Sequence, residues 1–358
     1  MPLTIAATGL ALVCACQPDS HPETLPTIGP PSSTDAERTE IDATSDSSAT
    51  RVDADLSDYR GRIPAARSAA RAYRLSDRSV LPAGPVARAR AGDIVLENDR
   101  AQFVVSTDDA SMSPCPYGGN PVDARGKSPP ARLDRDILGE ICPMLNVGRS
   151  FIPRRVEILD DGRHSGTAVV AAIGESAVLD FLNLRSLIPG SASGLLDRLA
   201  FDPGEPLPLS VTVYYLLGHG ETGLDVVTAL RNDGDETIHA LFGYLVKSGG
   251  PGAFFNPLND RGGFGYSPPD GGNLRGRPVP FLAGRSPRAS YAVVPDPVPR
   301  LGGRLPAGGA QVTVAGAAAI TIGQQDITRP LTAEREQFEK MDGVLHLAPG
   351  ASTAHHYR

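Results

Sequence analysis

The sequence contains no tryptophan, and aromatic residues make up only 5% of its 358 residues. A hydrophobic core is still feasible because 41% of the residues are hydrophobic, but Val, Leu, Ala and Ile have to build most of it. An excess of positive charge is also missing, since the formal net charge is -7. Without a basic surface, we expect no binding to nucleic acid.

Long helices are not expected either. The 39 glycines and 33 prolines form about a fifth of the chain, against roughly 12% in average proteins. Glycine and proline interrupt helices and favour turns, so this composition predicts many short elements. The length suits one large all-β domain or two ordinary domains.

The first 16 residues, MPLTIAATGLALVCAC, form an apolar run that is too short to span a bilayer as a helix. The run has the length and the small-residue end of an export signal. Its end, Val13-Cys14-Ala15-Cys16, resembles a bacterial lipobox, and Gln17 after it resembles the outer-membrane rather than the inner-membrane type. We therefore expect a lipoprotein signal over 1–16, lipidation of Cys16, and an exported protein that faces the outer membrane or periplasm. No Lys or Arg precedes Cys16, which leaves open an upstream start codon or an ordinary buried strand.

Residues 17–65 are rich in Pro, Ser, Thr, Asp and Glu and contain few large apolar residues. Such a composition cannot bury enough surface to offset the entropy of ordering the chain. We predict a disordered linker here that tethers the domain to its lipid anchor; a binding tail is the alternative. From residue 66 to residue 358 the composition is that of a folded domain.

Residues 91–106 carry the clearest β-hairpin pattern. Ile94 and Leu96, and then Phe103 and Val105, alternate with other residues at the period of a strand with one buried face. The intervening residues 97–100 (Glu-Asn-Asp-Arg) include turn formers. The pattern predicts two antiparallel strands joined by a short turn.

Further strand-like runs follow at intervals of about ten residues, which is typical of a β-sandwich or barrel. They lie at 156–159, 167–173, 209–217, 224–230, 238–246, 289–294, 311–314, 318–322 and 344–347. We therefore predict an all-β fold, an antiparallel β-sandwich with long Gly/Pro-rich loops, chiefly 107–142 and 247–290. A strand entering a turn near residue 348 would leave an open sheet edge at Arg358, so we expect a truncated reading frame.

Two short motifs resemble the galactose-mutarotase-like supersandwich family. One is Leu96-Glu97-Asn98-Asp99 leading into Phe103-Val104-Val105, and the other is the turn at 347–352 (LAPGAS). Residues 84–358 also resemble the N-terminal β-rich region of large exported proteins of myxobacteria and their relatives, which can carry a PHP-type metallohydrolase domain further on. The catalytic His and Glu of mutarotases cannot be placed here, and the His-x-His motif of PHP hydrolases is absent. The resemblance therefore implies a non-catalytic module.

Two cysteines, Cys115 and Cys142, would remain in the exported domain. An even pair in an oxidising compartment most often forms a disulfide. This bond would close a loop of about 27 residues and contribute roughly 3 kcal/mol on the chain-entropy model. Two unpaired buried thiols are the alternative.

Loop 107–142 also concentrates carboxylates, namely Asp123, Asp134, Asp136 and Glu140. Calcium prefers several such oxygen ligands, so Ca²⁺ is a candidate cofactor, although no EF-hand spacing is present. Turn formation and solvated charges explain Asp134 and Asp136 equally well. A pair of carboxylates could also perform glycoside chemistry at a suitable separation.

Aromatic and amide side chains suit saccharides, because sugar rings stack on aromatic faces. Tyr117 and Asn120, together with Phe264 and Tyr266, are candidates for a sugar-stacking platform beside Asp123 and Glu140. The alternative is that these aromatic residues simply cover the sandwich. No histidine has the spacing of a zinc motif, so we assign no metal ligands and no catalytic residues.

Our leading interpretation is a non-catalytic β-sandwich module of a lipid-anchored envelope protein, with glycan as its candidate ligand. The first alternative is a mutarotase-like or lyase-like carbohydrate enzyme with its site in loops 107–142 and 247–290. The second is an N-terminal fragment of a larger metallohydrolase. Grouping of Asp123, Glu140 and a histidine on one concave face would favour the enzyme.

Overall fold

The structure, a computed structural model, describes the following residues: 49–57, 70–77, 81, 87–107, 115–127, 138–146, 148–179, 205–248, 253–255, 282–285, 290–294, 311–315, 318–322, 335–340 and 344–358. In this part of the chain every strand pairing is antiparallel, and the one helix is α4 (Arg335–Glu339). The predicted all-β antiparallel fold is confirmed. The described part contains no helix with the length and hydropathy needed to cross a membrane.

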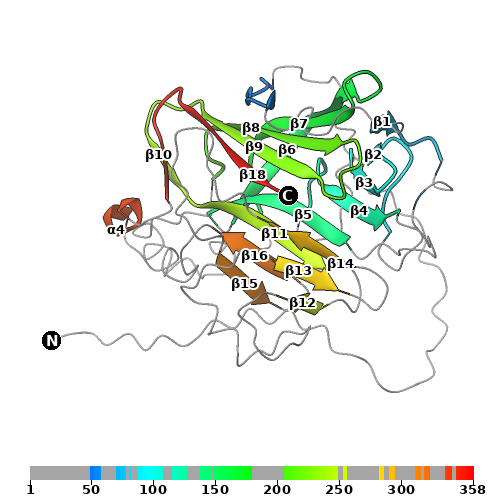
Figure 1. Cartoon of the computed structure of the whole chain (residues 1–358). Coiled ribbons are helices and arrows are strands. Elements are labelled where there is room, and N and C mark those ends of the chain that lie inside the picture. The colour runs from blue at the N-terminus through cyan, green and yellow to red at the C-terminus, as the bar shows by residue number, and fades with distance from the viewer. Residues whose placement is uncertain are drawn as a thin grey trace, which may run out of the picture. The chain divides into compact units, whose positions relative to one another are not determined.

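A four-stranded sheet contains the predicted hairpin. Its strands are β1 (Arg71–Arg74), β2 (Ile94–Glu97), β3 (Ala101–Val105) and β4 (Pro121–Gly126), in this spatial order (Figure 1). Ile94 pairs with Val105 and Leu96 with Phe103, in the register that the alternation predicts. The hairpin prediction is therefore confirmed in its strands and in its turn.

A nine-stranded sheet forms the body of the domain, in the order β15-β16-β11-β5-β6-β7-β8-β9-β18. Its strands are β5 (Leu138–Leu145), β6 (Arg149–Asp161), β7 (Thr167–Val178), β8 (Leu209–Gly218), β9 (Asp225–Asn232), β11 (Phe242–Ser248), β15 (Gln311–Ala315), β16 (Ala318–Ile322) and β18 (Ser352–Tyr357). Two smaller sheets pair β10 (Ile238–Ala240) with β17 (Leu345–Leu347), and join β12 (Ala253–Phe255), β13 (Leu282–Arg285) and β14 (Ser290–Val293). The turn predicted near residue 348 leads into β18, which pairs with β9 along its whole length.

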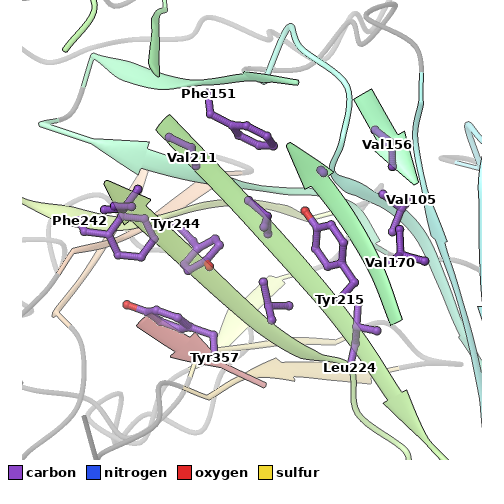
Figure 2. Close-up of a cluster of buried hydrophobic side chains, with 14 of the residues drawn as sticks. Val105, Phe151, Val156, Val170, Val211, Tyr215, Leu224, Phe242, Tyr244 and Tyr357 are labelled. Atoms are coloured by element: carbon purple, nitrogen blue, oxygen red, sulfur yellow. The ribbon is translucent and has the colours of Figure 1, made fainter. Parts of the chain in front are cut away.

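The nine-stranded sheet curves so that its two halves face each other across a shared core. Four strands separate β9 from β11 in the sheet order, yet the hydroxyls of Thr228 on β9 and Tyr244 on β11 are hydrogen-bonded. The Tyr244 ring also contacts the Tyr357 ring of β18, with the two centroids 4.5 Å apart (Figure 2). Aromatic and branched side chains therefore fill the concave side of the sheet.

On the other face of this sheet, residues 49–57 cover part of β7, β8 and β9. Val52 and Leu56 pack against Tyr214 and other apolar residues of β7, β8 and β9. The Tyr214 hydroxyl donates a hydrogen bond to Val52 O (2.7 Å), and Val52 N–H donates one to Thr212 Oγ1 (2.9 Å). Residues 49–57, which fall within the predicted linker, are therefore fastened to the sheet, chiefly by Val52 and Leu56.

Candidate functional site

The loop that precedes β4 is fixed to the main sheet. A disulfide joins Cys115 at the start of the loop to Cys142 on β5, with the two Cα atoms 6.2 Å apart. Further along, Gly119 has a positive φ of 79°, and a Cβ there would lie 3.1 Å from side-chain atoms of Ala172 and Phe151. Its carbonyl accepts a hydrogen bond from the Tyr215 hydroxyl (2.6 Å). The next residue, Asn120, is thus held in a defined position.

Asn120 is buried and uses only one end of its amide. Its Nδ2 donates to Tyr117 O (2.8 Å) and, at 3.4 Å, to Glu140 Oε1 on β5. Its Oδ1 accepts no hydrogen bond from the described part of the chain. Glu140 is fully buried beside it. A buried carbonyl oxygen that lacks a donor costs about 1–3 kcal/mol, so this atom is a candidate point of ligand contact.

Asp123 on β4 holds the backbone of the segment that precedes β2. Its Oδ1 accepts a hydrogen bond from Arg88 N–H (2.8 Å) and its Oδ2 accepts one from Ala89 N–H (3.1 Å). The same contact places the Arg88 side chain near Glu140, with Nη1 3.7 Å from Oε2. That separation gives an ion pair but no hydrogen bond, and Nη1 has no other hydrogen-bond partner among the described residues.

The structure therefore brings together three of the predicted ligand residues, Asn120, Asp123 and Glu140, and adds Arg88. Arg88 was not predicted, because nothing in its local sequence marks it. Arg88 is brought to the site by the hydrogen bond from its backbone N–H to Asp123, which is 35 residues away in the sequence. We call the set Asn120, Glu140, Asp123 and Arg88 the β4–β5 polar cluster.

Tyr117 contacts the same region differently from the prediction. Its hydroxyl donates to Val178 O (2.8 Å), so this end of the side chain anchors the loop. Phe264 and Tyr266, the other members of the predicted stacking platform, lie outside the described residues, as do Asp134, Asp136 and Cys16. Within the described ranges, no group of three or more His, Cys, Asp or Glu side chains is arranged to hold a metal ion.

Another buried carboxylate, Glu97 at the end of β2, has several charged and polar partners. Arg71 and Lys127 form ion pairs with it, and Gln102 Nε2 donates a hydrogen bond to its Oε2 (2.9 Å). Burial by itself raises the pKa of the Glu97 carboxyl, but the hydrogen bonds and charges of Lys127 and Arg71 outweigh it and keep the pKa below its usual value. These contacts tie β1, β2, β3 and the end of β4 together.

The histidines of the described part lie on elements other than β4 and β5. His164 and His219 are in turns, His239 is on β10, His346 is on β17, and His355 and His356 are on β18. His356 Nε2 is hydrogen-bonded to Asp225 Oδ1 (2.9 Å), whereas the His355 ring stacks on Phe242 in the core, with the ring centroids 4.7 Å apart. The structure does not place a histidine on the strands that carry Asp123 and Glu140.

No protein-family model and no curated protein matches the sequence. Solved structures with a similar arrangement include a galactose mutarotase related enzyme from Lactobacillus acidophilus, which is 11% identical with a TM-score of 0.38 over 74% of this chain and 95% of that one. A galactose mutarotase-like protein from Lactobacillus casei is 9% identical, with a TM-score of 0.39 over 75% and 99% of the two chains.

A TPR-domain containing protein from Parabacteroides distasonis is also similar, at 11% identity and a TM-score of 0.37 over 81% of this chain. The chain spans about half of that protein, or 53% of its length. The neighbours include galactose-mutarotase-like proteins. At these identities and TM-scores the likeness says nothing about chemistry.

Proposed function

We propose that this chain is a non-catalytic, glycan-binding β-sandwich module of an exported protein that Cys16 anchors to the outer membrane. The observation that carries the binding proposal is the β4–β5 polar cluster. Among the described residues, its Asn120 Oδ1 has no hydrogen-bond donor and its Arg88 Nη1 has no acceptor within hydrogen-bond distance.

A sugar hydroxyl is suited to such a cluster because it donates and accepts hydrogen bonds through the same oxygen. It could donate to Asn120 Oδ1 and accept from Arg88 Nη1. Glu140, Asn120 Oδ1 and Arg88 Nη1 are buried, whereas the Arg88 side chain as a whole is 28% exposed. A ligand would therefore approach from the Arg88 side and displace part of that side chain. A few polar groups at fixed positions, held by a rigid scaffold, are typical of small-ligand sites.

The same contacts favour binding over catalysis. Both carboxylate oxygens of Asp123 accept hydrogen bonds from backbone N–H groups, so this side chain serves to hold the backbone in place. The concave side of the main sheet is filled with buried apolar and aromatic side chains. A general acid or base has to reach the proton that it transfers, and this packing offers no described carboxylate in that position.

The cell-envelope part of the proposal is supported by the lipobox-like end of residues 1–16 and by the polar composition of the residues after it. Residues 49–57 pack on the outer face of the main sheet, so the polar segment leads into the body of the domain. In this arrangement the linker would hold the domain away from the membrane surface.

The decisive test is binding of the full chain to a panel of neutral oligosaccharides, measured by isothermal titration calorimetry. Arg88→Gln removes the guanidinium but keeps the backbone N–H that Asp123 requires. We expect affinity to fall at least about tenfold, because a hydrogen bond from a charged donor contributes roughly 1.5–3 kcal/mol.

Arg90→Gln is the matched control, because this exposed residue lies in the same segment and the substitution removes the same charge. We expect its affinity for the oligosaccharide to equal that of the unmodified chain. Equal affinity of all three proteins would place the glycan site elsewhere. The absence of any binding by the folded chain would overturn the proposed function.

A further inference from the structure

A pair of histidines lies on the outward face of the small sheet formed by β10 and β17. In the antiparallel register His239 is directly opposite His346. Their neighbours Ile238 and Ala240 on β10, and Leu347 on β17, are buried in the core. Because side chains alternate along a strand, this inward packing directs both imidazoles away from the core.

The two rings meet through one nitrogen each. His239 Nδ1 and His346 Nδ1 share a hydrogen bond of 2.9 Å, which a bound ion would replace. The rings are nearly perpendicular, with centroids 4.8 Å apart and an interplanar angle of 85°. The other nitrogen of His239, Nε2, lies 3.9 Å from Glu339 Oε1 on α4. Two distant parts of the sequence, residue 239 and residues 339–346, therefore meet at this point.

We propose that His239 and His346 form a two-nitrogen chelating site for a late first-row divalent cation, such as Ni²⁺, Cu²⁺ or Zn²⁺. Imidazole is a preferred ligand of these ions, at metal–nitrogen distances of about 2.1 Å. Two nitrogens at the observed separation would subtend an angle of roughly 90° at such an ion, on these distances. That angle fits two neighbouring positions of a tetragonal or octahedral ion, and a small ring movement would fit a tetrahedral one.

A histidine that binds a metal commonly donates a hydrogen bond from its other ring nitrogen to a carboxylate, and Glu339 is placed to accept one from His239. Coordination through Nδ1 requires the proton of a neutral imidazole to be on Nε2, and a nearby carboxylate favours that tautomer. The Glu339 carboxylate is beside His239 Nε2, where it can take up this role after a small movement. Two imidazoles do not make a closed cage, so water completes the coordination shell and the ion stays exchangeable.

A bound ion would connect strands that are 107 residues apart in the sequence. Any ligand that binds the folded chain more tightly than the unfolded chain raises its stability. The proposal therefore predicts both metal binding and a metal-dependent rise in the unfolding temperature. Acid should remove both effects, because protons compete with the metal for the same nitrogens.

The test is titration of the untagged full chain with Ni²⁺, followed by calorimetry and by thermal unfolding at pH 7.5. His239→Ala and His346→Ala should each weaken Ni²⁺ binding at this site at least about tenfold, and should each remove the rise in the unfolding temperature. His164→Ala is the matched control, because this histidine is exposed in the β6–β7 turn. It should bind Ni²⁺ as the unmodified chain does, and any binding by Cys14 or Cys16 is the same in all variants.

His346→Gln provides a second variant that retains a polar side chain on β17 in case the alanine variants do not fold. With Cu²⁺, electron paramagnetic resonance of the unmodified chain should show coupling to two nitrogens, and His346→Gln should reduce it to one. Unchanged coupling or unchanged Ni²⁺ affinity in the folded variants would overturn the proposal. So would the absence of any Ni²⁺ or Cu²⁺ binding by the unmodified chain.

Discussion

Two buried asparagines, Asn98 in the β2–β3 turn and Asn120 in the loop before β4, differ in how they use their amide oxygens. Asn98, in the β2–β3 turn, donates from Nδ2 to Gly218 O (2.7 Å) and Glu221 O (2.8 Å). Its Oδ1 accepts from Arg100 N–H and Ala101 N–H, at 2.7 and 2.8 Å. Asn120, before β4, fills its donor end but leaves Oδ1 without a donor from the described residues.

Asn98 therefore completes the fold, whereas Asn120 retains an acceptor oxygen that can still take part in a hydrogen bond. The same contrast occurs on β18, where successive side chains face opposite sides of the sheet. His356 is hydrogen-bonded to Asp225, whereas the buried Nε2 of His355 has no hydrogen-bond partner in the described part of the chain. Residues whose polar atoms are all hydrogen-bonded, such as Asn98, should contribute most to stability. Residues with an unbonded polar atom should matter for the pH response (His355) or for ligand binding (Asn120).

The largest effect is expected for Asn98→Ala. The substitution removes four hydrogen bonds from a buried turn, each contributing about 1 kcal/mol, so the free energy of unfolding should fall by about 4 kcal/mol. Urea unfolding of the full chain measures this change. Asp99→Ala, at the exposed neighbouring position, is the control and should alter stability by less than about 0.5 kcal/mol. A loss below about 1 kcal/mol for Asn98→Ala would remove the contrast with Asn120.

A smaller effect is expected from acid, through His355. Burial lowers the pKa of this imidazole to about 4, whereas in the unfolded chain its pKa is about 6.5. The unfolded chain therefore takes up a proton first as the pH falls. The stabilisation is fully present above about pH 6.5 and is lost as the pH falls towards 4, with roughly 2 kcal/mol lost between pH 8 and pH 5.

The measurement is urea unfolding at several pH values for the unmodified chain and for His355→Phe, which retains a ring to stack on Phe242. Other groups titrate equally in both proteins, so the difference between the two curves isolates His355. We expect this difference to vary with pH by about 2 kcal/mol over the stated range. A constant difference would mean that the buried imidazole is protonated without cost.

Local patterns in the sequence predicted many of the strands but not all of them. Strand β4 and the start of β5 lie in the predicted loop 107–142, and β12 and β13 lie in the predicted loop 247–290. The β2–β3 hairpin and the β6–β9 meander pair segments that follow one another, so period-two alternation and turn residues determine both strands and register. The packing of residues 49–57 on the sheet was not predicted, because composition averages over a segment. Only Val52 and Leu56 in that segment are buried in the sheet, and a low density of apolar residues conceals them.

The candidate sites depend on contacts between distant segments, which a local pattern cannot show. Asn120, Asp123 and Glu140 were found because they are close in sequence, but Arg88 enters through a backbone contact with Asp123. His239 and His346 were dismissed as metal ligands because each lacks a partner nearby in the sequence. Their pairing appears only once β10 and β17 are placed side by side.

The smallest effect on stability is expected for Asn120→Ala, and it tests the comparison most directly. The change removes the 2.8 Å hydrogen bond to Tyr117 O and a weaker contact with Glu140, but no bond to Oδ1, because that atom has none from the described residues. Urea unfolding should therefore show a loss of about 1 kcal/mol or less, well below that for Asn98→Ala. Oligosaccharide affinity should nevertheless fall several-fold, because the ligand loses an acceptor. A loss of stability equal to that of Asn98→Ala, with unchanged affinity, would show that the Asn120 amide completes the fold and would leave the glycan proposal without its central contact.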